Sequence, residues 1–315
     1  MHIPDGFLDA KTALATAALA AAGLGVALWH ARTRLPPRNV PLLGVSAAFV
    51  FAAQMVNFPV FGGTSGHLIG AVLTSALLGP SAAVIVLSAV LIVQCFVFAD
   101  GGITALGANI FNMGLIGGVG GWLVYYPVSR LVKGVFGRIV AATFAAWCST
   151  VLASVACAGE LAASGTIPWS TALPAMAGIH MFIGIGEGII TAMVLAATWQ
   201  ARPELLHSSP AGSNRSYKPL LAYGSLIALG LALFVSPFAC PWPDGLDKTA
   251  EVLGFKGRES DARLVPAIAP DYKMPGIKSP GRATAIAGAA GTILVFGMSW
   301  VVAGILVPRK RPENA

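Results

Sequence analysis

The chain has 315 residues, of which 56% are hydrophobic and 10% are charged, and its formal net charge is +7. Soluble domains carry about 25% charged residues. This composition therefore excludes an ordinary soluble domain and predicts an integral membrane protein. In such a chain the surplus of positive charge is better interpreted as a signal of topology than as a nucleic-acid-binding surface.

Nine apolar runs follow one another along the chain, and most approach the roughly 20 residues that a transmembrane helix requires. We expect an all-α integral membrane protein, a polytopic helix bundle of about seven core helices plus two further transmembrane helices. The third run ends at a Gly-Pro pair and is too short to span comfortably. It fits a half-helix, or a short helix beside a re-entrant loop that protein covers. The expected runs are 12–29, 40–58, 67–79, 81–98, 108–127, 139–163, 174–199, 219–236 and 283–306.

Basic residues cluster beyond alternate runs. If the short run at 67–79 counts as a crossing, twelve of them lie on one side of the membrane, and the positive-inside rule makes that side cytoplasmic. The N-terminus and the loops at 59–66 and 237–282 would then face outward, and the C-terminus would be cytoplasmic. The twelve are Arg32, Arg34, Arg38, Arg130, Lys133, Arg138, Arg202, Arg215, Lys218, Arg309, Lys310 and Arg311.

A polar stretch rich in Ser, Pro and Gly at 201–218 is typical of a linker. It divides the seven-run core, residues 1–200, from a two-run module at 219–315. The long loop of this module, 237–282, contains a segment that fits a short helix with Asp244 or Gly245 near its N-terminal cap.

The chain opens with MHIPDGFL, so a histidine directly follows the initiator methionine. A free amine at Met1, the backbone nitrogen of His2 and the His2 ring form a tridentate chelate. The amine and amide close a five-membered ring with a metal, and the amide and imidazole close a six-membered ring. The amide must lose its proton, which Ni²⁺ or Cu²⁺ readily drives, and square-planar nitrogen sites suit the same ions. We therefore expect a planar chelate with one corner open.

His67 is a candidate for that fourth corner. It follows a glycine-rich loop in NFPVFGGTSGHLIG, residues 57–70, and is expected on the same outward face as His2. Glycines allow one backbone to approach another closely. The turn at Pro4-Asp5-Gly6 could fold the N-terminus back toward this loop. The alternatives are a disordered terminal histidine at position 2 and a capping or interfacial histidine at position 67.

His180 and Glu187 are seven residues apart and fall on one helix face. Ionisable residues inside a membrane are functional candidates. This pair could relay protons, form a transit site for the metal or support the metal ligands, and the alternative is a polar pair that holds helices together. Asn57 is open to the same interpretations, with helix–helix hydrogen bonding favoured. So are Gln54, Asn109 and Asn112.

Three motifs, MHIPDGFL, GGTSGHLIG around His67 and GIHMFIGIGEGIITA around His180, together resemble the CbiM/NikM family. Members of this family are substrate-capture (S) components of energy-coupling factor (ECF) transporters for cobalt and nickel. The resemblance covers about residues 1–200. The sequence PDGLDKTAE, 243–251, resembles the PDGLE-type accessory subunit (NikN/CbiN-like) of the same systems, here fused and covering about 219–310. One methylene separates PDGLD from the more usual PDGLE.

The resemblance implies a seven-helix core with a tucked N-terminus that holds Ni²⁺ or Co²⁺ by the Met1 amine, the His2 amide and ring nitrogens, and His67. The ion would be cargo and not a permanent cofactor. It also implies a prokaryotic cytoplasmic membrane, a separate transmembrane scaffold (T) protein and two cytoplasmic ATP-binding cassette ATPases. The chain has no GxxxxGK[ST] motif, so we expect a transport component and not an enzyme. Planar nitrogen geometry and the fused module slightly favour nickel over cobalt.

A second class of function is a self-contained proton-coupled metal transporter, in which His180 and Glu187 carry protons between two inverted repeats. No clear internal repeat is visible in the sequence, which favours the ECF interpretation. A third class, an intramembrane hydrolase, would need a nucleophile setting such as GxSxG, and the sequence does not contain one.

Overall fold

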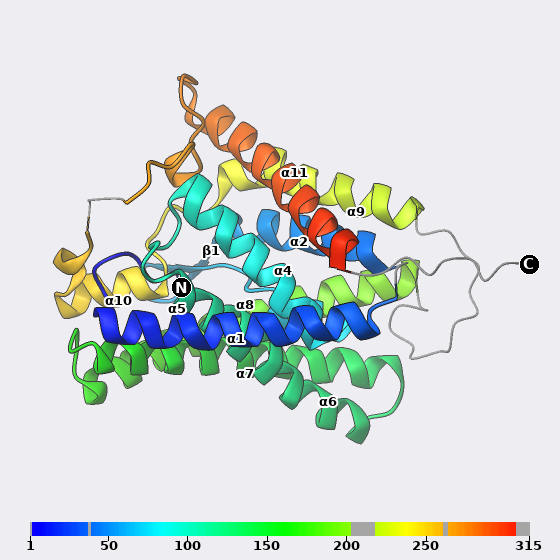
Figure 1. Cartoon of the computed structure of the whole chain (residues 1–315), viewed down its shortest axis with the longest axis horizontal. Coiled ribbons are helices and arrows are strands. Elements are labelled where there is room, and N and C mark those ends of the chain that lie inside the picture. Colours follow the sequence, from blue (N-terminus) through cyan, green and yellow to red (C-terminus); the bar gives the residue numbers. More distant parts are fainter. Residues whose placement is uncertain (1, 37–38, 203–217, 261–263, 307–315) are drawn as a thin grey trace, which may run out of the picture.

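The computed structural model describes residues 2–36, 39–202, 218–260 and 264–306 (Figure 1). Almost all regular structure in these residues is helical, apart from a two-stranded antiparallel hairpin that pairs Phe58 with Gly66. The expected all-α fold is confirmed, whereas most of the expected linker at 201–218 lies outside the described residues. The elements are α1 (Ala10–Arg34), α2 (Val40–Gln54), β1 (Phe58–Val60), β2 (Thr64–Gly66), α3 (Ala71–Leu78), α4 (Pro80–Val93), η2 (Gln94–Phe98), α5 (Leu106–Asn109), η3 (Ile110–Gly120), α6 (Gly121–Leu131), α7 (Gly134–Ala163), α8 (Trp169–Ala201), α9 (Lys218–Gly230), η5 (Leu231–Val235), η6 (Ser236–Phe238), α10 (Gly245–Leu253), η7 (Lys256–Arg258), η8 (Pro270–Tyr272) and α11 (Pro280–Leu306).

Six stretches of helix in the described residues are long and apolar enough to cross a membrane: α1, α4 with η2, α7, α8, α9 with η5 and η6, and α11. Two more expected runs coincide with the shorter apolar helix α2 and with the continuous rod of α5, η3 and α6. The short run at 67–79 contains the eight-residue helix α3, which begins after Gly70 and ends before Gly79. It is thus a short helix preceded by non-helical chain, as the sequence predicts.

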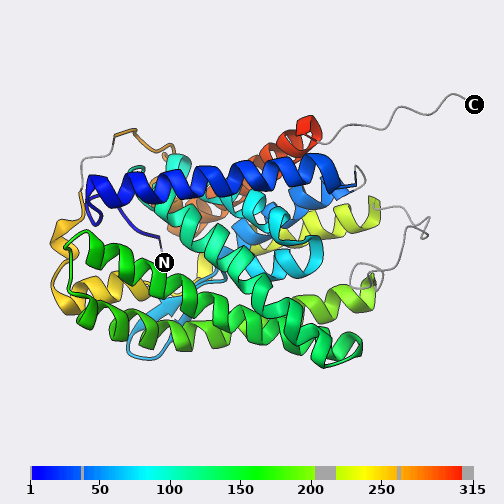
Figure 2. The ribbon, with the colours of Figure 1, turned by 60° about the horizontal axis from the view of Figure 1, so that its bottom comes forward.

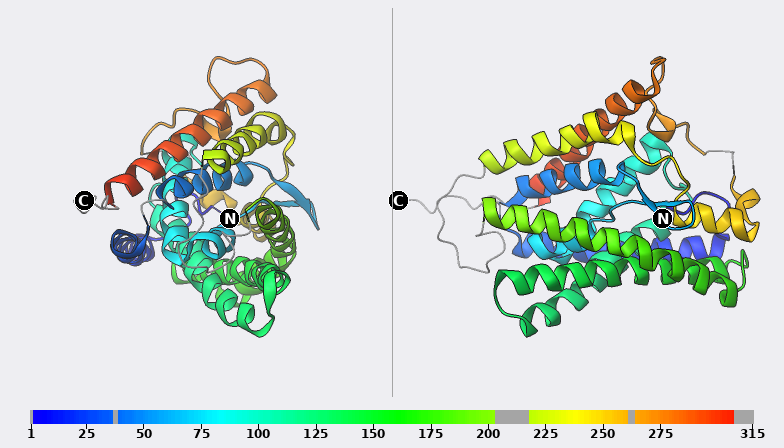
Figure 3. Two further views of the ribbon diagram at one scale, coloured as in Figure 1. Left: turned by 90° about the vertical axis from the view of Figure 1, so that its right-hand side faces the viewer. Right: turned by 180° about the vertical axis from the view of Figure 1, so that it is seen from behind.

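The C-terminal helices share one core with the rest of the bundle. Phe51 of α2, Val90 of α4 and Val295 of α11 belong to the same buried apolar cluster. Helix α4 is buried on nearly every side, which is typical of a helix that is hydrophobic all round. Helices α9 and α11 both pack against α2, and α7 and α8 form a long antiparallel pair (Figure 3).

The two ends of the bundle differ in chemistry. The last turns of α1 and α6 carry Arg32, Arg34 and Arg130, and they lie with the starts of α7 and α9 at the right-hand end of Figure 1. The N-terminal segment, the β1–β2 hairpin and α10 gather toward the opposite end (Figures 1 and 2). Residues 239–279, between η6 and α11, are called the connecting segment below. Its helix α10 begins after Asp244, as the sequence predicts.

Candidate metal centre

The N-terminal segment is threaded into the bundle and held from several sides. Ile3 and Phe7 have no solvent exposure. The backbone N–H of Ile3 donates to Asn109 Oδ1 at 2.8 Å, and Asn109 Nδ2 and the N–H of Gly102 donate to the Ile3 carbonyl at 3.1 and 2.9 Å. Asn109 was expected to join helices, but it binds the backbone of this segment instead. These bonds fix the position of the neighbouring His2.

Close packing by the connecting segment covers the same N-terminal turn. The N–H of Ser260 donates to the Asp5 carbonyl at 2.9 Å. Gly6 has φ +93°, and a Cβ placed on it would lie 2.2 Å from the carbonyl oxygen of Arg258. Only glycine satisfies both the positive φ and this close approach. The turn at Pro4-Asp5-Gly6 therefore lies between the helical core and the connecting segment and contacts both.

The side chains of His2 and His67 meet, although the two residues come from separate parts of the chain. Their ring centroids are 5.2 Å apart and their planes differ by 21°. The Nδ1 of His67 lies 3.1 Å from the Leu68 carbonyl oxygen, which can only accept, so this nitrogen carries the proton. In the neutral ring, Nε2 is then the nitrogen that can bind a metal. Met1, the third expected contributor, lies outside the described residues.

The His2 ring is oriented by two polar partners. Its Nδ1 is 3.2 Å from Asp100 Oδ1, and its Nε2 is 3.2 Å from Gln94 Oε1. Burial lowers the pKa of His2, while the charge of Asp100 acts in the opposite direction. Burial therefore favours the neutral imidazole that metals bind. The expected six-membered chelate ring contains the Nδ1 atom of His2. This nitrogen would therefore have to leave Asp100 in order to bind the ion.

Asp244 is a third residue at this point, and sequence analysis did not identify it as a ligand candidate. One ligand atom from each of His2, His67 and Asp244 lies within 4.8 Å of the other two. Asp244 is the N-cap of α10, and its Oδ1 accepts from the N–H groups of Leu246 and Asp247 at 2.8 and 2.9 Å. Asp244 could have been identified from its place in the PDGLD motif, because that motif lies on a loop expected on the same side of the membrane as both histidines.

Backbone contacts hold Asp244 in place. The N–H of Ser65 donates to the Pro243 carbonyl at 2.8 Å, and Ser65 Oγ donates to the Trp242 carbonyl at 2.7 Å. The N–H of Cys240 donates to the Asn57 carbonyl at 2.9 Å, so Asn57 meets the connecting segment through its backbone. The segment that precedes α10 is thus fastened along the β1–β2 hairpin, next to His67.

His180 and Glu187 lie on one side of α8 but contact different parts of the site. His180 packs beneath the start of α10, where a Cβ on Gly245 would lie 2.7 Å from His180 Cε1. The Nδ1 of His180 lies 2.7 Å from the Met176 carbonyl oxygen. Glu187 accepts from the N–H groups of Ile69 and Gly70 at 2.5 and 2.9 Å, directly after His67. This geometry fits support of the site better than a relay between the two residues.

A chain of amides links the two histidine-bearing segments. Gln94, whose Oε1 faces His2, donates through Nε2 to Gln54 Oε1 at 2.8 Å. Gln54 in turn donates through Nε2 to the Ile69 carbonyl at 3.0 Å. Together with Glu187, these bonds hold the backbone behind His67 from two sides.

Tyr272, in η8 of the connecting segment, reaches the site through Asp100. Its hydroxyl donates to Asp100 Oδ2 at 2.5 Å, while Asp100 Oδ1 faces His2. The Tyr272 ring stacks on Phe98 with centroids 4.7 Å apart. The connecting segment therefore approaches the histidine pair at two places, directly through Asp244 and indirectly through Tyr272.

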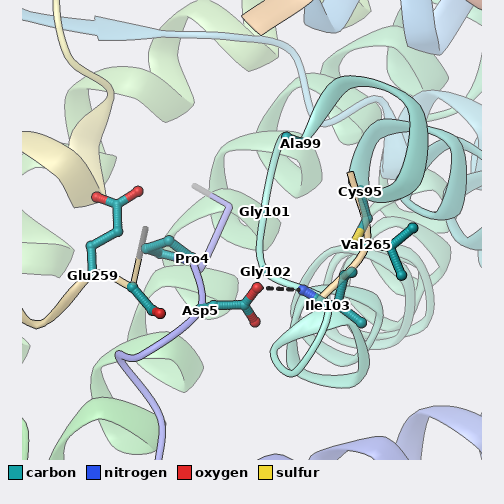
Figure 4. Close-up of a pocket in the computed structure, with 10 residues that line it drawn as sticks. Pro4, Asp5, Cys95, Ala99, Gly101, Gly102, Ile103, Glu259 and Val265 are labelled. Atoms are coloured by element: carbon teal, nitrogen blue, oxygen red, sulfur yellow. Dashed lines mark hydrogen bonds between the residues drawn. The ribbon is translucent and has the colours of Figure 1, made fainter. Parts of the chain in front are cut away.

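A small pocket opens beside the N-terminal segment (Figure 4). Asp5 and Glu259 bring carboxylates to its lining, and the Asp5 carboxylate accepts from the N–H groups of Ile103 and Thr104 at 3.1 and 2.8 Å. Gly101 also lines the pocket, and a Cβ on it would lie 3.5 Å from His2 Cβ. The pocket thus borders the segment that carries His2, and its Glu259 carboxylate is paired with Lys256 at 2.6 Å.

Two family models match the chain. The model of the cobalt uptake substrate-specific transmembrane region, CbiM, matches residues 2–205, and that of the PDGLE domain matches residues 218–308. The chain belongs to the CbiM family. The second match adds a NikN-like module at the C-terminus of this CbiM-family chain.

Proteins with the same fused arrangement are similar over most of their length. The chain is 34% identical over 304 residues to the putative fused nickel transport protein NikMN of Archaeoglobus fulgidus, covering 96% of this chain and 98% of the relative. It is 34% identical over 299 residues to the fused nickel transport protein NikMN of Rhodobacter capsulatus, covering 88% and 84%. A crystal structure of a truncated transition metal transporter is similar with a TM-score of 0.58 and 33% identity, covering 64% of this chain and 99% of that one.

These similarities place the CbiM-family chain among metal-uptake proteins of the membrane. Its relatives are transport proteins and not enzymes, as the sequence predicts. The six long apolar helices agree with a multi-pass membrane protein.

Proposed function

We propose that this CbiM-family chain is the substrate-binding component of an ATP-driven, ECF-type uptake system for divalent nickel or cobalt ions, with nickel slightly favoured. The ion is held by the Met1 amine, the His2 amide and Nδ1, and Nε2 of His67. The observation that carries this proposal is the meeting of His2 and His67, with ring centroids 5.2 Å apart, on two independently anchored backbone segments. Preordered ligands lose little conformational freedom when the ion binds.

The polarity of the bundle supports capture from outside. The arginines at the ends of α1 and α6 lie at the end opposite the N-terminal segment and α10 (Figure 1). Following the positive-inside rule, we assign the arginine end to the cytoplasm and the histidine pair to the outer side in this proposal. In this proposal a scaffold T protein and cytoplasmic ATPases supply the energy, which agrees with the lack of a phosphate-binding loop in the sequence.

Substitution of His67 tests the site. We expect His67→Ala, in the purified full-length chain with its native start, to weaken Ni²⁺ binding by at least about 100-fold, because a ligand is lost. The matched control is His30→Ala, since His30 is bonded to Ser81 between α1 and α4, away from the site. Equal Ni²⁺ affinity in His67→Ala and the parent chain would contradict the proposal.

Reconstitution tests the energy source. Vesicles that contain the chain together with its T protein and ATPases should take up Ni²⁺ only when ATP is supplied on the ATPase side. Uptake by the chain alone, driven by a proton gradient, would contradict the ECF proposal and support a self-contained transporter.

A further inference from the structure

The proposed chelate carries a net positive charge that its own ligands do not neutralise. A divalent ion bound by a deprotonated amide and three neutral nitrogens keeps one positive charge. A buried charge without an opposite partner is costly. His67 is buried, and one of its ring nitrogens lies within 4.8 Å of a ring nitrogen of His2, so an ion held by both would also be buried. A nearby carboxylate would neutralise the complex.

Asp244 is the carboxylate that lies close to both histidines, whereas Asp100 faces His2 and accepts a hydrogen bond from Tyr272. One oxygen of Asp244 lies within 4.8 Å of a ring nitrogen of both His2 and His67. Donors at about 2.0–2.2 Å from one ion lie about 3–4 Å apart. In the proposed complex the three donors are at right angles to one another and lie about 3 Å apart, so each pair must close by at most about 2 Å to share an ion.

The carboxylate is also preoriented. Its Oδ1 caps α10 by accepting from the N–H groups of Leu246 and Asp247, and the preceding residues are bonded to the β1–β2 hairpin. Gly245, packed against His180, lets the start of α10 lie this close to α8. Asp244 is therefore held next to the histidine pair at the end of a helix. Binding sites built on helices are positioned more precisely than sites built on loops.

We propose that Asp244 donates a carboxylate oxygen to the bound cation, above the plane of the nitrogen ligands, so that the connecting segment completes the metal site. This inference rests on the proposed function of the histidine pair. It makes the fused module part of the binding site itself. The ion then sits in a neutral, five-coordinate complex shared between the CbiM-like and PDGLE-like parts of the chain.

Asp244→Asn removes the charge with almost no change in shape, and asparagine is as good an N-cap as aspartate. The matched control is Asp247→Asn, in the first turn of the same helix, whose carboxylate pairs with Lys256 at 2.7 Å. Both variants are prepared as the full chain with its native start, and NiCl₂ is titrated against a competing chelator. We expect Asp244→Asn to lose about 10–100-fold in Ni²⁺ affinity and Asp247→Asn to stay within about twofold of the parent.

X-ray absorption of the Ni²⁺-loaded parent chain tests the same inference without a variant. We expect the absorption edge of the parent chain to be that of five-coordinate Ni²⁺ with an oxygen donor. The edge of Asp244→Asn should be closer to that of planar, four-coordinate Ni²⁺. A four-nitrogen planar edge in the parent, or parental affinity in Asp244→Asn, would overturn the role of Asp244 while leaving the histidine site intact. Parental affinity in His67→Ala would instead overturn the proposed site.

Discussion

Replacing Glu187 with glutamine tests how the fold positions His67. Glu187 is fully buried, and its two oxygens accept from the N–H groups of Ile69 and Gly70 at 2.5 and 2.9 Å. Glutamine has nearly the same shape but only one acceptor oxygen. Its NH₂ group would face one of the two backbone donors, so the segment that follows His67 would shift or leave a donor unsatisfied.

The size of the effect follows from these two bonds. A hydrogen bond to a charged group contributes about 1.5–3 kcal/mol, and a buried unsatisfied donor costs about 1–3 kcal/mol. We expect a local loss of about 2–4 kcal/mol. Relaxation of the backbone reduces this loss, and the remaining loss weakens metal binding. Changes in the partners that orient metal ligands typically cost about 10–100-fold in affinity, which is the range we expect for Ni²⁺.

The assay is a competitive Ni²⁺ titration together with thermal unfolding of the metal-free protein. Glu160→Gln is the matched control, because Glu160 is a second buried carboxylate, which accepts from Asn112 Nδ2 at 2.7 Å between helices. The control should lower the melting temperature and leave Ni²⁺ affinity within about twofold. Parental affinity in Glu187→Gln, or an equal loss of affinity in both variants, would refute a specific positioning role for Glu187.

Two further predictions concern the connecting segment. Gly245→Ala should weaken Ni²⁺ binding, because its Cβ would lie 2.7 Å from His180 Cε1 and 2.9 Å from Ile183 Cδ1 and displace α10. Adding His180→Ala together with Ile183→Val removes both contacts and should restore part of the loss in the same titration. The absence of any rescue would contradict the steric cause. Tyr272→Phe keeps the stacking on Phe98 but removes the O–H bond to Asp100. We expect it to weaken Ni²⁺ binding by about threefold to tenfold, because Asp100 would keep neither the His2 Nδ1 nor the Tyr272 hydroxyl as a partner once the ion binds. This is part of the about 1.5–3 kcal/mol of a hydrogen bond to a charged group. Unchanged affinity would show that Asp100 does not need Tyr272 when His2 binds the ion.

The transmembrane architecture could be predicted from the sequence because it depends on local properties. Run length and hydropathy determine where helices form in lipid. The cap of α10 was likewise visible, since an Asp-Gly pair before a helical pattern is a local signal. His2 could be named as a candidate ligand because the chelate depends only on its position next to the chain end. His67 could be named because it follows a glycine-rich loop on the expected outward side and lies in a motif that resembles the CbiM/NikM family.

The partners of those ligands could not be predicted, because they depend on which helices pack together. Ser65 and Trp242 are bonded although they lie 177 residues apart. Nothing in the sequence around Asp244 indicates that it faces His67 and not solvent. Similarly, Asn109 lies in an apolar run, where an amide is expected to hydrogen-bond between helices. In the structure its side chain instead exchanges two hydrogen bonds with the buried backbone of Ile3. Such choices are made by tertiary packing and leave no periodic pattern.

The central claim is that the chain's own amino terminus is a metal ligand. The most direct test adds two glycines before Met1, which moves the amine away from His2, while all other residues stay the same. Two glycines are used because a chain with histidine in third place would itself form a four-nitrogen chelate for Ni²⁺. Parent and extended chains are titrated with Ni²⁺ and Co²⁺ and followed by visible absorption. We expect one ion per parent chain and weak or spectrally altered binding in the extended chain. Equal binding with equal spectra in both would contradict the claim and direct attention to the side chains of His2, His67 and Asp244 alone.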